Sequence, residues 1–198
     1  MSYQIVAFGD SNTRYYLGDT GEAGPLEDAW PARLERMLRA RKVDAVVKNE
    51  GCPGEQADFA MARFAEVTRG ASLCILGFGT NDAKKLEVPL GEFLSEISDV
   101  IDQAAEAKIP LILLGIPWFS EDLAGKELQA RLPVWNESLS SLCSQLSIPF
   151  VDLYGVFQGD PERWFNERST PKRHLSAAAQ ARVAELVFPL VLERINRG

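Results

Sequence analysis

The chain has 198 residues, 46% of them hydrophobic, which suffices for a sizeable core, so we expect a single domain over residues 1–198. A net charge of −7 without a long basic run argues against nucleic acid as a partner. The amino terminus lacks the basic and apolar regions of a signal peptide, and no stretch approaches the ~20 apolar residues that span a bilayer. We therefore expect a cytoplasmic protein without a membrane span.

Cysteine and histidine are too few and too scattered for a disulfide framework or a metal site. The three cysteines, Cys52, Cys74 and Cys143, are widely spaced, and the single histidine is His174. Cys74 and Cys143 fall within apolar patterns, which indicates reduced thiols packed in the core.

Apolar runs and helical patterns alternate along the chain. Strands are predicted over residues 5–8, 45–47, 73–78, 110–116 and 148–153. Helices are predicted over residues 28–41, 55–70, 90–108, 126–147 and from 176 onward, with a long loop over residues 13–27. Alternation of this kind predicts an α/β fold with a doubly wound, five-stranded parallel sheet.

Several residues indicate where these helices begin and end. Asp28 is the expected N-cap of the first helix, with Pro31 in its first turn. Asp82 is placed to cap the helix that follows it, and Pro133 is expected to interrupt the fourth helix with a kink or a restart. Pro189 is a candidate for a bend in the last helix.

Four polar positions follow predicted strands. Ser11 comes after the first strand, Gly51 after the second, Asn81 after the third, and His174 lies in the loop after the fifth. Because the carboxyl ends of parallel strands form the edge of the sheet where ligands bind, these residues are expected to converge there.

The residue types at this edge suit acyl transfer. Ser11 is a weak nucleophile until a base takes its proton, and His174 is the only imidazole available. The N–H groups of Ser11 and Gly51 and the Asn81 amide could stabilise the oxyanion, and a side chain on Gly51 would hinder the approach of its N–H to substrate. Each residue also has a simpler interpretation: a turn serine, a turn glycine, a turn or cap asparagine, and a histidine capping the last helix.

Four segments, in this order, resemble the sequence blocks of the SGNH (GDSL-type) hydrolases. They are Gly9-Asp10-Ser11-Asn12, the Asn49-x-Gly51-x-x-Gly54 pattern, Gly79-Thr80-Asn81-Asp82, and the tail that begins His174-Leu175-Ser176. The resemblance implies a serine esterase or lipase on a flavodoxin-like three-layer αβα fold. It further implies Ser11 as nucleophile, His174 as base, an oxyanion hole of Ser11, Gly51 and Asn81, and no metal or organic cofactor.

The chain departs from the family pattern at one position. Where the family usually carries the acid that orients the histidine, three residues before it, this chain has Pro171. We favour a Ser–His dyad whose ring is held by a backbone carbonyl; a displaced acid or a degenerate, weakly active site are the alternatives. The candidates for orienting His174 are the carbonyls of residues 171–173, Glu167, Asp160 and Asp152.

The expected function is hydrolysis of a small-molecule carboxylic ester, with a short acyl or acetyl group because a chain of this length leaves little room for a lid. A non-catalytic or weakly active binding module on the same fold is the alternative, because a fold does not fix an activity. Aromatic residues in or near the edge loops could build an acyl or alcohol pocket, or could anchor the loops to the core: Tyr15, Tyr16, Phe78, Trp118, Phe119, Trp164 and Phe165. The sequence does not predict the oligomeric state.

Overall fold

The sheet has five parallel strands, as the sequence predicts. A computed structural model describes residues 2–18, 22–119, 121–166 and 174–197. The strand order is β2-β1-β3-β4-β5, and every neighbouring pair is parallel. The strands are β1 (Tyr3–Gly9), β2 (Ala45–Gly51), β3 (Leu73–Gly77), β4 (Leu111–Leu114) and β5 (Phe150–Val151).

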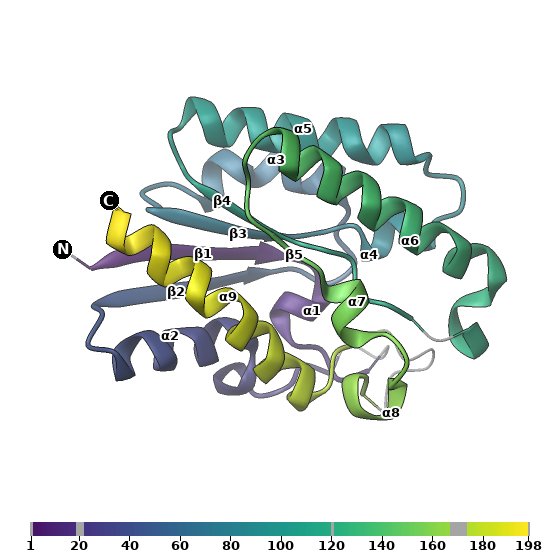
Figure 1. Ribbon diagram of the computed structural model, residues 1–198, viewed down its shortest axis with the longest axis horizontal. Helices are drawn as coiled ribbons and strands as arrows, with labels where there is room; N and C mark the ends of the chain where they lie inside the picture. Colours follow the sequence, from purple (N-terminus) through teal and green to yellow (C-terminus); the bar gives the residue numbers. More distant parts are fainter. Residues whose placement is uncertain (1, 19–21, 120, 167–173, 198) are drawn as a thin grey trace.

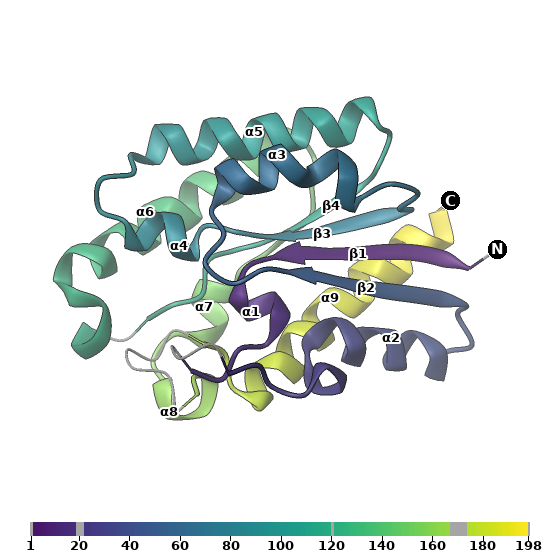
Figure 2. The ribbon, with the colours of Figure 1, turned by 180° about the vertical axis from the view of Figure 1, so that it is seen from behind.

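Helices cover both faces of this sheet and complete a three-layer α/β fold (Figures 1 and 2). On one face lie α2 (Trp30–Ala40) and α9 (Ala177–Arg197), which pack against each other. On the other face lie α3 (Ala57–Val67), α5 (Leu90–Glu106) and α6 (Glu121–Gln145). The order β2-β1-β3 means that the chain reverses its winding direction beside β1, the strand that ends at Ser11.

The core lies between the sheet and its two helical layers. Strand β3 is central, and its residues from Leu73 to Leu76 are all buried, which explains their unbroken apolar run. Helix α5 buries a stripe at helical spacing that includes Phe93, Ile97 and Val100. Each large apolar side chain buried in this way contributes about 1.5–3 kcal/mol to the stability of the fold. The central strands therefore form a rigid support for the loops.

Short helices gather at the carboxyl end of the sheet, whereas both chain termini lie at the amino end (Figure 1). Strand β1 leads directly into α1 (Ser11–Arg14), a helical turn within the segment from Ser11 to Glu27 that the sequence predicts as turn and loop. The other short helices are η1 (Leu26–Asp28), α4 (Thr80–Lys84), α7 (Leu153–Phe157) and α8 (Pro161–Trp164).

The two predicted helix caps are wrong in detail, because distant residues supply the hydrogen bonds. Ala29, not Asp28, is the N-cap of α2, and the Trp30 N–H donates instead to Oε1 of Gln180 at 2.8 Å. Asp82 lies within α4, and its Oδ1 accepts a 2.9 Å hydrogen bond from the N–H of Ala57, the first residue of α3. Sequence proximity could not reveal either partner.

The break in α6 falls at Gly125 rather than at Pro133. Gly125 has φ 72° and ψ 154°, a conformation that glycine adopts without a steric penalty, whereas Pro133 lies inside the helix. Pro189 likewise lies inside α9. Among the helices that the structure describes, none combines the length and apolarity needed to cross a bilayer.

Candidate active site

Ser11 and His174 meet at the carboxyl end of the sheet. The Ser11 Oγ lies 3.0 Å from Nε2 of His174, although 163 positions separate the two residues in sequence. Ser11 is the first residue of α1, and His174 precedes α9 by three residues. A hydroxyl within hydrogen-bonding distance of an imidazole nitrogen is the geometry that lets the ring accept the hydroxyl proton.

Asp10 fixes the turn that presents Ser11. It is the N-cap of α1, and its Oδ1 accepts a 2.8 Å hydrogen bond from the Asn12 N–H. Burial raises the pKa of Asp10 to about 6, although hydrogen bonds from the Asn12 N–H and the Thr80 side chain favour the ionised form. The sequence motif therefore has a structural basis: the acid before Ser11 holds the helical turn that carries the hydroxyl.

Hydrogen bonds hold the His174 segment on both sides. The Asn166 N–H donates to the His174 carbonyl at 2.8 Å, and the Ser176 N–H donates to the Trp164 carbonyl at 2.9 Å. On the other side, the Leu175 N–H donates to Oδ1 of Asn12 at 3.0 Å. The backbone that carries the imidazole is thus anchored between the α8 region and the α1 turn.

Gly51 lies beside α1, but for a different reason than the sequence suggests. A Cβ on Gly51 would lie 2.3 Å from the backbone nitrogen of Arg14, so close packing of two backbones requires the glycine. The Gly51 N–H donates to Oδ1 of Asn49 at 3.0 Å, and Nδ2 of Asn49 donates to the Thr13 carbonyl at 3.0 Å. Asn49 thereby ties the end of β2 to α1 and engages the Gly51 N–H.

Two other donors of the predicted oxyanion hole remain available. Nδ2 of Asn81, in α4, donates one hydrogen to the Glu55 carbonyl at 2.8 Å, which leaves its second hydrogen for a ligand. The N–H of Ser11 belongs to the first turn of α1, where no preceding helical carbonyl can accept it. Gly54, in the loop after β2, has φ +80° and open space around its Cβ position, and its N–H donates to no residue in the described part of the chain.

The two described acids that were candidates for orienting His174 act as helix caps. Asp152 accepts a 2.9 Å hydrogen bond from the Gly155 N–H at the start of α7, and Asp160 accepts one of 3.3 Å from the Arg163 N–H in α8. The other candidates, Glu167 and the carbonyls of residues 171–173, together with Pro171 itself, lie outside the described residues.

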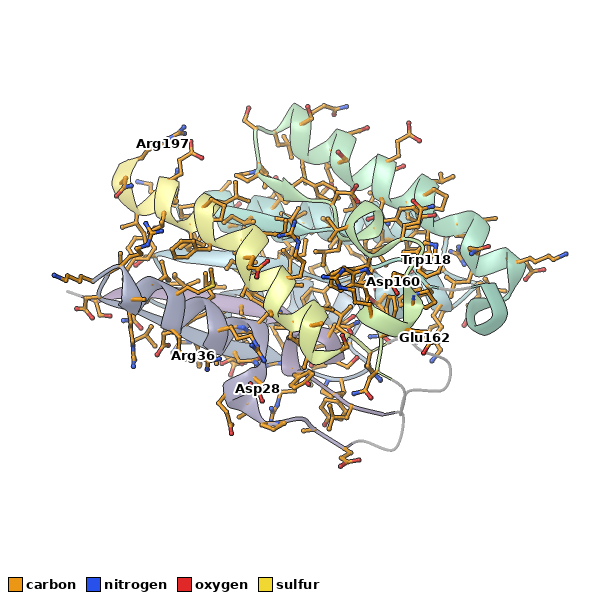
Figure 3. The ribbon with its side chains drawn as sticks, turned by 60° about the horizontal axis from the view of Figure 1, so that its bottom comes forward. Asp28, Arg36, Trp118, Asp160, Glu162 and Arg197 are labelled. Carbon is orange, nitrogen blue, oxygen red and sulfur yellow. The ribbon has the colours of Figure 1, made fainter. Side chains whose placement is uncertain are left out.

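The aromatic residues near the site divide into two groups. Buried in the core as loop anchors are Tyr15, Phe78, Phe119 and Phe165. Tyr16, Trp118 and Trp164 are partly exposed, and the Tyr16 ring centroid lies 6.4 Å from that of His174. Tyr16 is placed to line a substrate site because its ring is close to that of His174. Trp118 lies at the same end of the molecule as Asp160 and Glu162, far from Arg197 at the other end (Figure 3).

Cys52 follows Gly51 but is poorly suited to compete with Ser11 as nucleophile. Its thiol pKa is raised, first by burial and then by a hydrogen bond and charge interaction with Glu55. Because the thiolate is the reactive form, a raised pKa makes the sulfur less nucleophilic at neutral pH. Within the described ranges, no three His, Cys, Asp or Glu side chains form a group that could hold a metal ion.

Comparison with known proteins gives one family and a set of similar folds. The model of the GDSL-like Lipase/Acylhydrolase family matches residues 7–182. A lipase/acylhydrolase from Enterococcus faecalis is 20% identical, with a TM-score of 0.83, over 97% of this chain and 96% of that chain. A carbohydrate acetylesterase family member from Sinorhizobium meliloti is 17% identical, with a TM-score of 0.75, over 98% and 99%.

A third similar structure is the psychrotrophic esterase EstA from Pseudoalteromonas sp., described as inhibited by monoethylphosphonate. It is 14% identical, with a TM-score of 0.75, over 98% of this chain and 100% of that chain. No curated protein sequence matches the chain.

Proposed function

Because the chain belongs to the GDSL-like lipase/acylhydrolase family, we propose that it hydrolyses carboxylic esters with Ser11 as nucleophile and His174 as general base. The single observation that carries this proposal is the 3.0 Å distance between Ser11 Oγ and His174 Nε2. Contact between the only imidazole of the chain and a hydroxyl at the end of β1 supports catalysis over the alternative of a non-catalytic binding module.

In the first half of the reaction, Nε2 of His174 takes the Ser11 proton while Oγ bonds to the acyl carbon. The tetrahedral intermediate collapses as the bond to the alcohol oxygen breaks, and the imidazolium donates its proton to that oxygen. In the second half, His174 takes a proton from water as the water oxygen bonds to the acyl carbon. The bond from that carbon to Ser11 Oγ then breaks, and the imidazolium returns its proton to Oγ, which releases the acid and restores Ser11.

Negative charge on the intermediate requires donors that are already in place. We assign the Ser11 N–H and the second Nδ2 hydrogen of Asn81 to this role, since no described residue accepts either of them. Gly51 can contribute only by sharing the hydrogen that it donates to Asn49. Gly54, whose N–H donates to none of the described residues, is therefore the alternative third donor from the loop after β2.

A Ser–His dyad is the catalytic unit that we propose on the residues described, in which Asp152 and Asp160 serve as caps of α7 and α8. In a serine protease, loss of the orienting acid lowers turnover by about 10⁴, but nucleophile and oxyanion hole still give substantial catalysis. The proposed substrate is a small ester with a short acyl group, and the acetylesterase among the similar folds agrees with this choice.

The test is hydrolysis of p-nitrophenyl acetate, butyrate and dodecanoate by the wild type and three variants. Ser11→Ala should abolish turnover, and His174→Ala should lower kcat by about 10²–10⁴, the usual contribution of a general base. Cys52→Ala is the control and should retain wild-type turnover, because that thiol takes no part in the reaction.

Two results would contradict different parts of the proposal. Turnover that survives Ser11→Ala would exclude the proposed nucleophile. A larger kcat/KM for dodecanoate than for acetate or butyrate would leave the serine mechanism intact but contradict the short acyl group.

A further inference from the structure

Asn12, which follows the proposed nucleophile, connects it to the proposed base. Its side-chain Oδ1 accepts the Leu175 N–H at 3.0 Å, directly beside His174. Its backbone carbonyl accepts a 2.8 Å hydrogen bond from Nε2 of Gln180. One residue next to Ser11 therefore contacts both the segment that carries His174 and the first turns of α9.

Gln180 extends this connection to a third segment. Its Oε1 accepts the Trp30 N–H at 2.8 Å, so both ends of its amide are used. Gln180 is 0% exposed and Asn12 is 8% exposed, so water cannot readily replace these bonds. A buried polar group that loses its partner is destabilised, so the three segments hold one another in a single arrangement.

We propose that Asn12 and Gln180 are positioning residues that set the distance between Ser11 Oγ and His174 Nε2. This inference rests on the proposed function. Asn12 holds the backbone of Leu175, one residue after the imidazole, and Gln180 holds the backbone of Asn12, one residue after the hydroxyl. Each contact thus holds the backbone next to one of the two reacting residues, His174 or Ser11.

The chemistry of Asn12 fits a role that uses one end of its amide. Oδ1 is engaged with Leu175, whereas Nδ2 is buried and has no hydrogen-bond partner in the described structure. A buried donor without a partner lowers stability, so Nδ2 gives the fold no benefit at this position. The acceptor oxygen is thus the feature that matters at this position, which yields a matched pair of variants.

The first test compares Asn12→Leu with Asn12→Asp. The leucine removes the acceptor at similar size, whereas the carboxyl group keeps an acceptor oxygen in either protonation state. Because a shift of about 1 Å between reacting groups can lower the rate about 10²-fold, we expect Asn12→Leu to lower kcat at least ~30-fold. KM should stay within about threefold, and Asn12→Asp should recover kcat to within about tenfold of wild type.

Gln180→Glu is the second variant and keeps the fold-stabilising half of the contact. One carboxylate oxygen of the glutamate can accept a hydrogen bond from the Trp30 N–H. The other oxygen replaces the amide nitrogen of Gln180, and in the ionised form it has no hydrogen to donate to the Asn12 carbonyl. We expect kcat to fall about fivefold or more at unchanged KM. Ile97→Val, a core change in α5 away from the site, is the control for lost stability and should leave kcat unchanged.

A structural measurement separates failure of this inference from failure of the proposed function. In a crystal structure of Asn12→Leu, or of Gln180→Glu if the leucine variant does not fold, the Ser11 Oγ to His174 Nε2 distance should exceed 3.5 Å. A distance still near 3.0 Å, or a kcat within threefold of wild type for both Asn12→Leu and Gln180→Glu, would overturn the positioning role. Absence of wild-type esterase activity would instead overturn the proposed function. The Ser11 Oγ to His174 Nε2 distance in the variants would then test the positioning role by itself.

Discussion

Asp10 is the N-cap of α1, but its buried position is unfavourable for its charge. Its carboxylate caps α1 beside Ser11, yet burial raises its pKa to about 6 from an ordinary value of 3.8. The folded state therefore binds the proton more tightly than the unfolded state. Its contribution to stability is present in full below about pH 3.8 and is lost as the pH rises through about 6.

Asp10→Asn should remove this pH dependence while keeping the cap, because asparagine is an equally good N-cap. The pKa difference corresponds to about 3 kcal/mol, so the variant should gain up to that amount relative to wild type between pH 4 and pH 8. Urea unfolding of both proteins at the two pH values measures it. A difference in unfolding free energy that is equal at pH 4 and pH 8 would show that Asp10 does not titrate in this range.

Individual residues show where sequence reasoning succeeds and where it stops. The meeting of Ser11 and His174 follows from strand order and from the rule that parallel strands end at one edge, and the structure places them 3.0 Å apart. The partners of Trp30 and Ala57 could not be predicted, because Gln180 and Asp82 reach them across the fold. The engagement of the Gly51 N–H by Asn49 also depends on side-chain placement that no spacing encodes.

At the scale of elements, the contact between β2 and α1 supports the nucleophile. A methyl group on Gly51 would lie 2.3 Å from the Arg14 nitrogen and 2.9 Å from the Asp10 carbonyl oxygen. Both are backbone atoms, so neither can move aside without displacing α1. Accommodating such an overlap typically costs about 1–3 kcal/mol.

Gly51→Ala should therefore lower the unfolding free energy by about 2 kcal/mol and reduce ester turnover, because α1 carries Ser11. Gly91→Ala is the matched control: nothing lies within 4 Å of a Cβ at Gly91, in the first turn of α5. Alanine there should stabilise the protein by up to about 1 kcal/mol. Equal stability of the two variants in thermal or urea unfolding would contradict the close packing of β2 on α1.

Among the elements, long periodic segments were predictable and short ones were not. Helix α5 and strand β3 follow directly from their apolar patterns, and their cores are buried as expected. The sequence does not predict the four-residue helix α1, because its first turn depends on the Asp10 cap and on contacts with β2. The sequence predicts the break in α6 at Pro133, but a proline can remain within a helix, whereas Gly125 takes a non-helical conformation.

For the whole molecule, the account depends on the arrangement of the chain ends around one sheet. Strand order brings Ser11, near the amino terminus, and His174, near the carboxyl terminus, to the same edge. Alternating strands and helices were sufficient to predict this doubly wound fold. The residues that orient the imidazole were not predictable, since the family's acidic position holds Pro171 in this chain.

The most direct measurement is the intact mass of the protein after exposure to a fluorophosphonate probe, followed by peptide mapping. We predict one adduct, on Ser11, that is absent from Ser11→Ala and forms about 10²-fold or more slowly in His174→Ala, because the imidazole must take the hydroxyl proton. A wild-type protein that remains unmodified, or that carries its adduct on another residue, would contradict the assignment of Ser11 and His174 as nucleophile and base.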